Sequence, residues 1–261
     1  MTLSIAAHLD YWFEHPTDVL LQFEAAATPE QVISHAHLDI TPCEHFARVP
    51  ALDLIGERIW VRLQGRLLVD YRARVRIERR NAGTLDLPIM PQHELPGETV
   101  QYLMASRYCP SDQFQNFVEA EFGGIADGSK VLAMRDWIAG HLEYTPGSSH
   151  SDTTALDTFV KRQGICRDYA HVMITLARAA GVPARIASVY ALGVDPPDFH
   201  AVAEVFLGGE WRLIDATGMA AESDMAVIGV GRDAADVAFL TAFGGMWMNG
   251  QSVTVARVED D

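Results

Sequence analysis

One strongly helical run, residues 166 to 180, constrains the fold of this chain more than any other segment. It is rich in alanine, leucine, methionine and isoleucine, it opens just after Gly164, and Gly181-Val182-Pro183 closes it. Three strand-like segments follow directly: residues 184–192, 201–207 and 211–214. Gly208-Gly209 predicts a tight turn between the last two. A helix followed by a hairpin of strands predicts an α+β unit in which the helix packs on an antiparallel sheet.

The segments around this unit extend the same pattern. Helical periodicity with plausible start signals occurs in residues 111–122, 130–142 and 152–163. After the hairpin, the tail shows a glycine turn at 229–231, an apolar stretch at 238–243 and a last strand at 252–258.

Residues 1–100 have the alternation of β-structure instead. Ile59 to Leu63 and Leu67 to Ile77 alternate apolar and polar residues, and Gln64-Gly65-Arg66 between them predicts a hairpin turn. Several such strands predict a small sandwich or open barrel. The proline-rich stretch 85–110 predicts a linker, so we expect a β-rich domain over 1–100 and a catalytic domain over 101–261.

Composition limits the partners and the compartment. The formal net charge of −15 argues against nucleic acid, because phosphate binding needs a cationic face. The three cysteines are too few and too scattered for a disulfide framework or a CxxC zinc site. No signal peptide and no apolar run of ~20 residues is evident. These features predict a cytoplasmic protein with no membrane association; they do not indicate an oligomeric state.

A cysteine, a histidine and a carboxylate occur in that order on a predicted helix, strand and strand. Cys166 lies where the helix begins, and the free N–H groups and dipole of a helix N-terminus favour the nucleophilic thiolate. His200 and Asp215 fall on the two strands joined by the glycine turn, so both can lie at one edge of the hairpin. An imidazole can hold the thiol proton, and a carboxylate can orient the imidazole.

Each of these residues also has a simpler interpretation. A cysteine at a helix start is most often a small apolar filler. A single histidine on a strand is most often packed or hydrogen-bonded, and an aspartate in Asp-Ala-Thr can begin a turn. The order of the three residues favours the catalytic interpretation, and the simpler ones stay open at this point.

The chain resembles the bacterial transglutaminase-like proteins of the papain-like thiol superfamily over about residues 100 to 245. The resemblance is carried by Gly164-Ile165-Cys166-Arg167-Asp168-Tyr169-Ala170-His171, Gly181-Val182-Pro183-Ala184-Arg185, Asp198-Phe199-His200-Ala201 with Glu204, and Gly209-Glu210-Trp211-Arg212-Leu213-Ile214-Asp215-Ala216-Thr217. It implies a papain-like transglutaminase core preceded by a small all-β, sandwich-like domain. Two positions depart from the common family form: Val202, where an aromatic residue is usual, and Ala216, where proline is frequent.

The resemblance also implies roles for these residues. Cys166 would be the nucleophile, His200 the general base and acid, and Asp215 the residue that orients His200. The reaction would form an acyl-thioester from an amide and pass the acyl group to water or to an amine.

Further residues have two interpretations each. The hydroxyl of Tyr144 could join the Cys166 backbone N–H in an oxyanion hole, or Tyr144 could be a core tyrosine after a helix. Asp168 in the first helical turn could stabilise the helix dipole or fix the backbone around the cysteine. His171 and Glu204 are candidate supporting groups behind the catalytic residues.

Three functions remain to be compared. The first is a cofactor-independent cysteine amide hydrolase or acyltransferase that acts on peptide, isopeptide or glutamine amides of a peptide or protein substrate. Hydrolysis is preferred because no segment is evident that would exclude water. The second is a binding or scaffolding protein that keeps the fold without catalysis. The third, a metal-dependent hydrolase, is disfavoured because no HExxH or similar ligand spacing occurs, and no metal site is expected.

Overall fold

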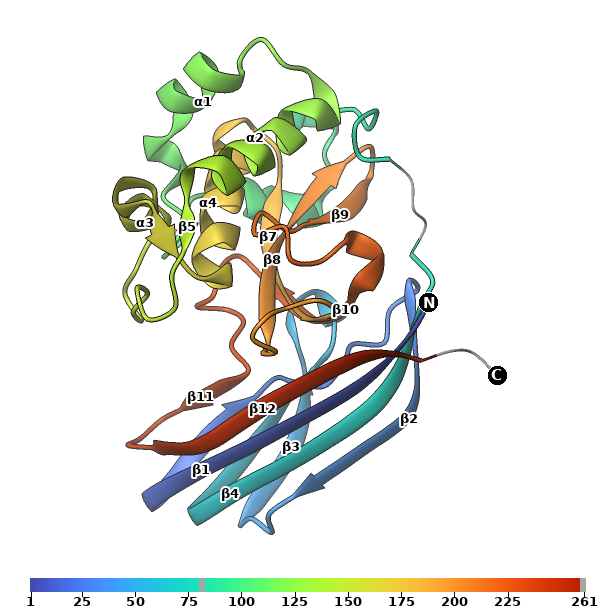
Figure 1. Ribbon diagram of the computed structural model, residues 1–261, viewed down its shortest axis with the longest axis vertical. Helices are drawn as coiled ribbons and strands as arrows, with labels where there is room; N and C mark the ends of the chain where they lie inside the picture. The colour runs from blue at the N-terminus through green and yellow to red at the C-terminus, as the bar shows by residue number, and fades with distance from the viewer. Residues whose placement is uncertain (80–82, 259–261) are drawn as a thin grey trace.

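A computed structural model describes residues 1–79 and 83–258 of the chain. Helices and a short-stranded sheet form one part of the molecule, and long strands form a curved sheet across the other (Figure 1). This confirms the predicted α+β class with an N-terminal β-region. No helix of the described residues is long and apolar enough to cross a membrane.

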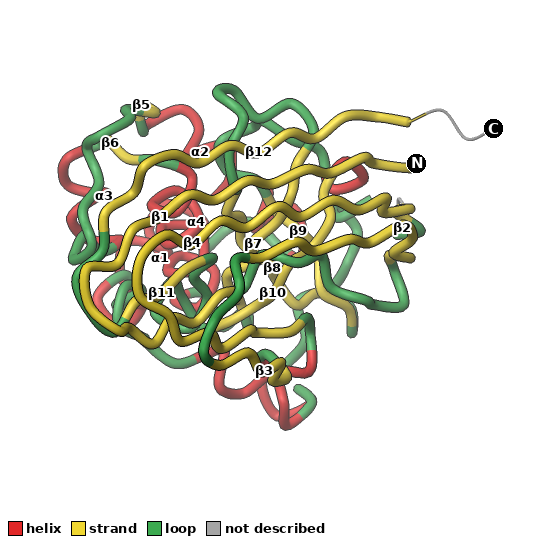
Figure 2. The backbone as a smooth tube through the Cα atoms, turned by 90° about the horizontal axis from the view of Figure 1, so that it is seen from below, coloured by secondary structure: helices red, strands yellow, loops and turns green. Residues whose placement is uncertain are grey.

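The long-stranded sheet is antiparallel and has six strands among the described residues: β1 (Thr2–Leu21), β2 (Gln31–Ile40), β3 (His45–Pro50), β4 (Glu57–Ile77), β11 (Leu240–Ala242) and β12 (Trp247–Val258). β1 pairs with β4 along most of its length and with β11 and β12 on its other side. β2 and β3 pair with the far side of β4. Figure 2 shows β12, β1, β4 and β2 running side by side.

The structure differs from the sequence predictions for this sheet in three ways. The described strands form one continuous hydrogen-bonded sheet, where a small sandwich or open barrel was expected. Gln64-Gly65-Arg66 is not a hairpin turn: β4 runs through it, and Gly65 (φ 93°) sits where the register with β1 shifts between Phe13 and Thr17. A glycine with positive φ serves a bulge as well as a turn, so the local signal was ambiguous. Finally, β11 and β12 join the N-terminal sheet, so a division at residue 100 does not separate the strands.

The other part contains a second antiparallel sheet in the order β10-β7-β8-β9. Its strands are β7 (Ala184–Ala191), β8 (His200–Leu207), β9 (Glu210–Ile214) and β10 (Met225–Gly231). The expected turn at 229–231 lies inside β10, where the register with β7 shifts after Val227. The two-residue strands β5 (Glu143–Tyr144) and β6 (Gln163–Gly164) form a parallel pair.

The helices are α1 (Gln115–Phe122), α2 (Asp127–His141), α3 (Ala155–Lys161) and α4 (Cys166–Ala179), and the 3₁₀ turns are Leu52–Leu54, Gln92–Glu94, Gly97–Leu103, Ser111–Gln113 and Glu222–Asp224. α4 is the central helix, as its composition predicted. Val172 and Leu176 of α4 are fully buried in one core with Ala203 and Val205 of β8. The start of α4 is thereby held beside the start of β8.

The two parts are joined by a buried interface between the long sheet and strands β7 and β10. Tyr190, Ala226 and Ile228 belong to the same core as the inner face of the long sheet. The Tyr190 hydroxyl donates to the Phe23 carbonyl at 2.6 Å. The Gln31 carboxamide donates to the Val227 carbonyl and accepts from the Val227 N–H, both at 2.8 Å. The long sheet is therefore anchored next to the segments that flank the site.

Candidate active site

Cys166 is the first residue of α4, directly after strand β6. The Asp168 carboxylate caps this helix start by accepting the Ile165 N–H at 2.9 Å, and it also accepts the Ser149 hydroxyl at 2.9 Å. A Cβ at Gly164 would lie 2.8 Å from the Asp168 Cβ, so the close approach of strand to helix needs glycine. The local sequence thus presents the thiol at a capped helix N-terminus.

His200 and Asp215 meet at the ends of β8 and β9. His200 Nε2 and Asp215 Oδ2 are 3.0 Å apart, and both side chains are almost fully buried. Three further groups donate to the carboxylate, the Thr217 N–H at 2.8 Å, the Thr217 hydroxyl at 2.7 Å and the Ala220 N–H at 3.0 Å. Asp215 is therefore a fully hydrogen-bonded, oriented carboxylate.

The electrostatics of this pair favour the charged forms. Burial alone would lower the pKa of His200, but hydrogen bonds and charge interactions with Asp215 and Cys166 raise it to about 9. Burial would raise the pKa of Asp215, and the bond to His200 together with those from Thr217 lowers it below its ordinary value. An imidazolium–carboxylate pair is the preferred state at neutral pH.

Cys166 and His200 line the same cavity, of about 520 Å³. The Nε2 atom of His200 is used by Asp215, and Nδ1 is buried without a hydrogen-bond partner among the described residues. Interaction with the Cys166 thiol nevertheless contributes to the raised pKa of His200. Nδ1 is thus the nitrogen free to exchange a proton in the cavity.

Tyr144 lies in the same cavity, at the end of β5. Burial raises the pKa of its hydroxyl to about 12, and charge interaction with Cys166 and contact with the Cys166 backbone are further influences. The hydroxyl therefore stays protonated in the cavity that Cys166 also lines, and its role as an oxyanion donor stays a prediction.

The other predicted supporting residues lie elsewhere. Glu204 does not join the site, because its carboxylate accepts from Arg185 Nε at 2.7 Å and Arg185 also pairs with Asp53. His171 is fully buried behind α4, where its Nε2 accepts the Ala234 N–H at 3.2 Å. Burial lowers the pKa of His171 to about 3, so it stays neutral.

The walls of the cavity come from segments to which the sequence patterns assigned no role. One wall is the loop after β7, with Val194, Pro196 and Phe199, and the other is the segment after β10, with Val237 and Phe239. Phe199 and Phe239 stack at 4.8 Å between ring centroids. The available sequence signals were the family resemblance at Asp198-Phe199 and over residues 231–237.

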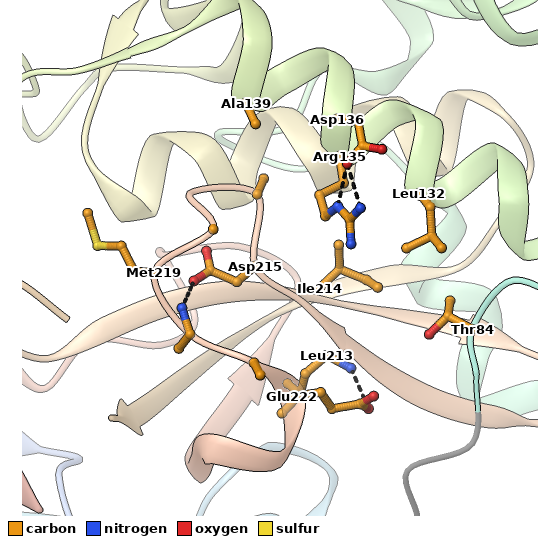
Figure 3. A pocket seen from close by; sticks show the side chains of 14 residues that line it. Thr84, Leu132, Arg135, Asp136, Ala139, Leu213, Ile214, Asp215, Met219 and Glu222 are labelled. Atoms are coloured by element: carbon orange, nitrogen blue, oxygen red, sulfur yellow. Dashed lines mark hydrogen bonds and ion pairs between the residues drawn. The ribbon is translucent and has the colours of Figure 1, made fainter. Parts of the chain in front are cut away.

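A second cavity, of about 570 Å³, lies on the outer side of the Asp215 loop, between that loop and α2 (Figure 3). Figure 3 shows Asp215 at its edge and the Arg135–Asp136 pair of α2 on the far wall. The Ala220 N–H donates to the Asp215 carboxylate there. Neither Cys166 nor His200 lines it. Of the three candidate catalytic residues, only Asp215 lines this second cavity.

Comparison with known proteins identifies a family and several similar structures. The model of the transglutaminase-like superfamily matches residues 118–216. The crystal structure of a candidate cysteine protease from Cytophaga hutchinsonii superposes with a TM-score of 0.91 at 34% identity, covering 100% of this chain and 92% of that one. The periplasmic domain of TgpA from Pseudomonas aeruginosa gives a TM-score of 0.42 at 18% identity, over 82% of this chain and 76% of its own.

A curated relative, an uncharacterized protein of Mycobacterium leprae (strain TN), is 29% identical over 116 residues, which is 41% of this chain and 42% of the relative. The match therefore spans less than half of that protein. The similarity to the Cytophaga structure extends over both parts of the fold. Because the family model and the Cytophaga structure both match it, the chain belongs to the transglutaminase-like superfamily.

Proposed function

We propose that this protein is a cysteine-nucleophile amide hydrolase that acts on peptide, isopeptide or glutamine amides through an acyl-thioester. The observation that carries the proposal is the buried His200–Asp215 pair, 3.0 Å apart, whose histidine lines the same cavity as a cysteine at a helix N-terminus. A thiol, an imidazole and an orienting carboxylate are the groups that nucleophilic acyl transfer needs.

In the first half of the reaction, the Cys166 thiolate attacks the amide carbonyl carbon and forms a C–S bond. The carbonyl oxygen becomes an oxyanion, which the Cys166 N–H and the Tyr144 hydroxyl stabilise. His200 gives its Nδ1 proton to the amide nitrogen, the C–N bond breaks, and the amine leaves. Each oxyanion donor contributes about 2.7–4 kcal/mol in comparable enzymes.

In the second half, His200 accepts a proton from water as the water oxygen attacks the thioester carbon. The C–S bond breaks, the acid product leaves, and the thiolate–imidazolium pair is restored. A primary amine in place of water would give cross-linking. We favour water because the cavity is open to solvent on the side of the exposed residue Asp198 and water is the abundant acceptor.

The test is hydrolysis in ¹⁸O-labelled water. A pool of peptides that contain glutamine is incubated with the protein, and mass spectrometry locates ¹⁸O in glutamate side chains or in new C-terminal carboxyl groups. We expect label with the wild type and with Cys43→Ala, and none with Cys166→Ala. Added dansylcadaverine measures transfer to amines in the same mixture. Absence of label and of amine transfer with folded wild-type protein would contradict the proposal and favour a non-catalytic binding protein.

A further inference from the structure

The cavity beside Cys166 contains one acidic residue among its described lining residues, Asp198. The other charged residues that line it are His200, which belongs to the proposed catalytic pair, and Arg167. The Arg167 guanidinium is turned away to a neighbouring loop, where it donates to the Ser149 hydroxyl at 2.7 Å and the His150 carbonyl at 2.6 Å. Asp198 is thus the charge that the cavity presents to a ligand.

The Asp198 carboxylate is held in place through one oxygen only. Oδ1 accepts the Phe199 N–H at 2.7 Å and the Gln251 carboxamide at 2.6 Å. Oδ2 has no hydrogen bond or ion pair to any residue within 1–79 and 83–258. The carboxylate is therefore oriented, and its second oxygen is available.

The partner that orients Asp198 comes from the long sheet. Gln251 lies on β12, and its Oε1 accepts the Tyr11 hydroxyl of β1 at 3.2 Å. A chain of hydrogen bonds, Tyr11 to Gln251 to Asp198, thus runs from the sheet to the rim of the cavity. Charge interaction with Asp198 also contributes to the raised pKa of Tyr144, after burial and Cys166, so the carboxylate lies within electrostatic range of the thiol end of the cavity.

Apart from Asp198, the two walls formed by the loop after β7 and the segment after β10 are apolar. Val194, Pro196, Phe199, Val237 and Phe239 face the cavity from both sides. An apolar trough suits an apolar side chain, and a negative charge at its rim suits a cation.

We propose that Asp198 is a specificity-determining residue that binds the guanidinium or ammonium of a basic residue in a peptide substrate whose neighbouring apolar side chain occupies the trough. This inference rests on the proposed function and names its substrate class. Gln251 is a positioning residue for Asp198. The long sheet then contributes to substrate selection by holding the carboxylate at the rim.

Binding separates this inference from the question of catalysis. Fluorescein-labelled peptides with one leucine and one variable position (arginine, lysine, norleucine or glutamate, scanned along the peptide) are titrated into Cys166→Ser by anisotropy. Because Asp198 is exposed, we expect arginine and lysine peptides to bind about two- to fivefold tighter than norleucine at the best position. The preference should weaken as salt rises.

Variants of equal net charge isolate the local effect. Asp198→Asn should abolish the preference, whereas Asp195→Asn, in the same exposed loop but outside the cavity lining, should keep it. Gln251→Ala should reduce it while the Asp198 charge remains. Thermal melting verifies that each variant is folded.

Three results would overturn the inference. The first is that basic peptides bind no tighter than norleucine peptides. The second is an equal loss of the preference in Asp195→Asn and Asp198→Asn, which would reduce the effect to net charge. The third is a preference for lysine without arginine, which would indicate an amine acceptor at Asp198. Iodoacetamide labelling of wild-type Cys166 is measured in parallel, because an unreactive thiol would count against the proposed function while the binding result still decides the role of Asp198.

Discussion

At the scale of single residues, the site depends on how many hydrogen bonds the Asp215 carboxylate accepts. Four donors converge on its two oxygens, and one of them is His200. A buried carboxylate with this many partners stays ionised and fixes the imidazole in one orientation. Sequence order correctly indicated which three residues the fold brings together. Their catalytic roles stay predictions.

The pH dependence of the free energy of unfolding should show whether His200 and Asp215 form a charged pair. The pKa of His200, about 9, exceeds the ordinary value near 6.5, so its contribution is complete below about pH 6.5 and is lost as pH rises through about 9. The lowered pKa of Asp215 has the opposite sense: its contribution is present above about pH 3.9 and is lost as pH falls through its folded pKa. Urea denaturation should give a lower free energy of unfolding for His200→Gln than for the wild type. This difference should be roughly 3 kcal/mol larger at about pH 6 than at about pH 10. An unchanged difference would contradict the charged pair.

Tyr144 allows a sharper test of the oxyanion prediction. Tyr144→Phe removes only the hydroxyl, so the ring and its contact with Tyr169 remain. We expect turnover to fall at least several-fold and up to about 100-fold, with unchanged thermal stability. Tyr169→Phe is the matched control and should retain turnover. Equal turnover in Tyr144→Phe and wild type would exclude the hydroxyl from the mechanism.

At the scale of elements, the start of α4 is the feature on which the site depends most. Asp168 caps it from the third helical position, and Ser149 and Arg167 hold the same carboxylate. The prediction of a helix beginning at Cys166 was correct because glycine, cysteine and a first-turn aspartate gave a local signal. The actual supporting role of Ser149 depends on a loop contact that no local pattern encodes.

Capping can be separated from catalysis with a matched pair of variants. Asp168→Ala should cost about 1–3 kcal/mol in unfolding free energy and should also reduce Cys166 reactivity, because the helix N-terminus loosens. Asp157→Ala removes the equivalent cap of α3, where Asp157 bonds Thr154, and should cost about 1 kcal/mol without changing that reactivity. If both variants lower reactivity equally, general destabilisation is the cause and the specific role of Asp168 is wrong.

At the scale of the whole molecule, the two ends of the chain build one sheet together. Thr2 pairs with Val258, and β1 lies between β4 and β12 (Figure 2). Periodicity predicted strands in both regions, but it carries no information on which distant strands pair, so a sandwich of the first hundred residues was expected. The same limit concealed the cavity walls, since the loop after β7 and the segment after β10 meet only in the fold.

The interface between the long sheet and strands β7 and β10 can be tested at Gln31. Gln31→Leu keeps the volume but leaves the buried Val227 N–H without its partner, while the Val227 carbonyl keeps only the Ala26 N–H. We expect a loss of about 2–3 kcal/mol in unfolding free energy, measured by urea denaturation. Gln64→Leu, on an exposed glutamine of the same sheet, should change it by less than about 0.5 kcal/mol. A Gln31→Leu protein as stable as the Gln64→Leu protein would show that this bond pair does not hold the parts together.

The most direct test of the account is the rate at which iodoacetamide alkylates each cysteine as a function of pH, resolved by peptide mass spectrometry. The partly exposed Cys43 is the reference thiol, and Cys109 is buried with its pKa raised to about 12 by burial. An ordinary thiol with a pKa of about 8.5 is mostly protonated at about pH 6. We predict that Cys166 reacts at least about tenfold faster than Cys43 there, and that His200→Ala removes this advantage. If Cys166 follows Cys43 at every pH in both proteins, no thiolate–imidazolium pair exists and the proposed nucleophile is wrong.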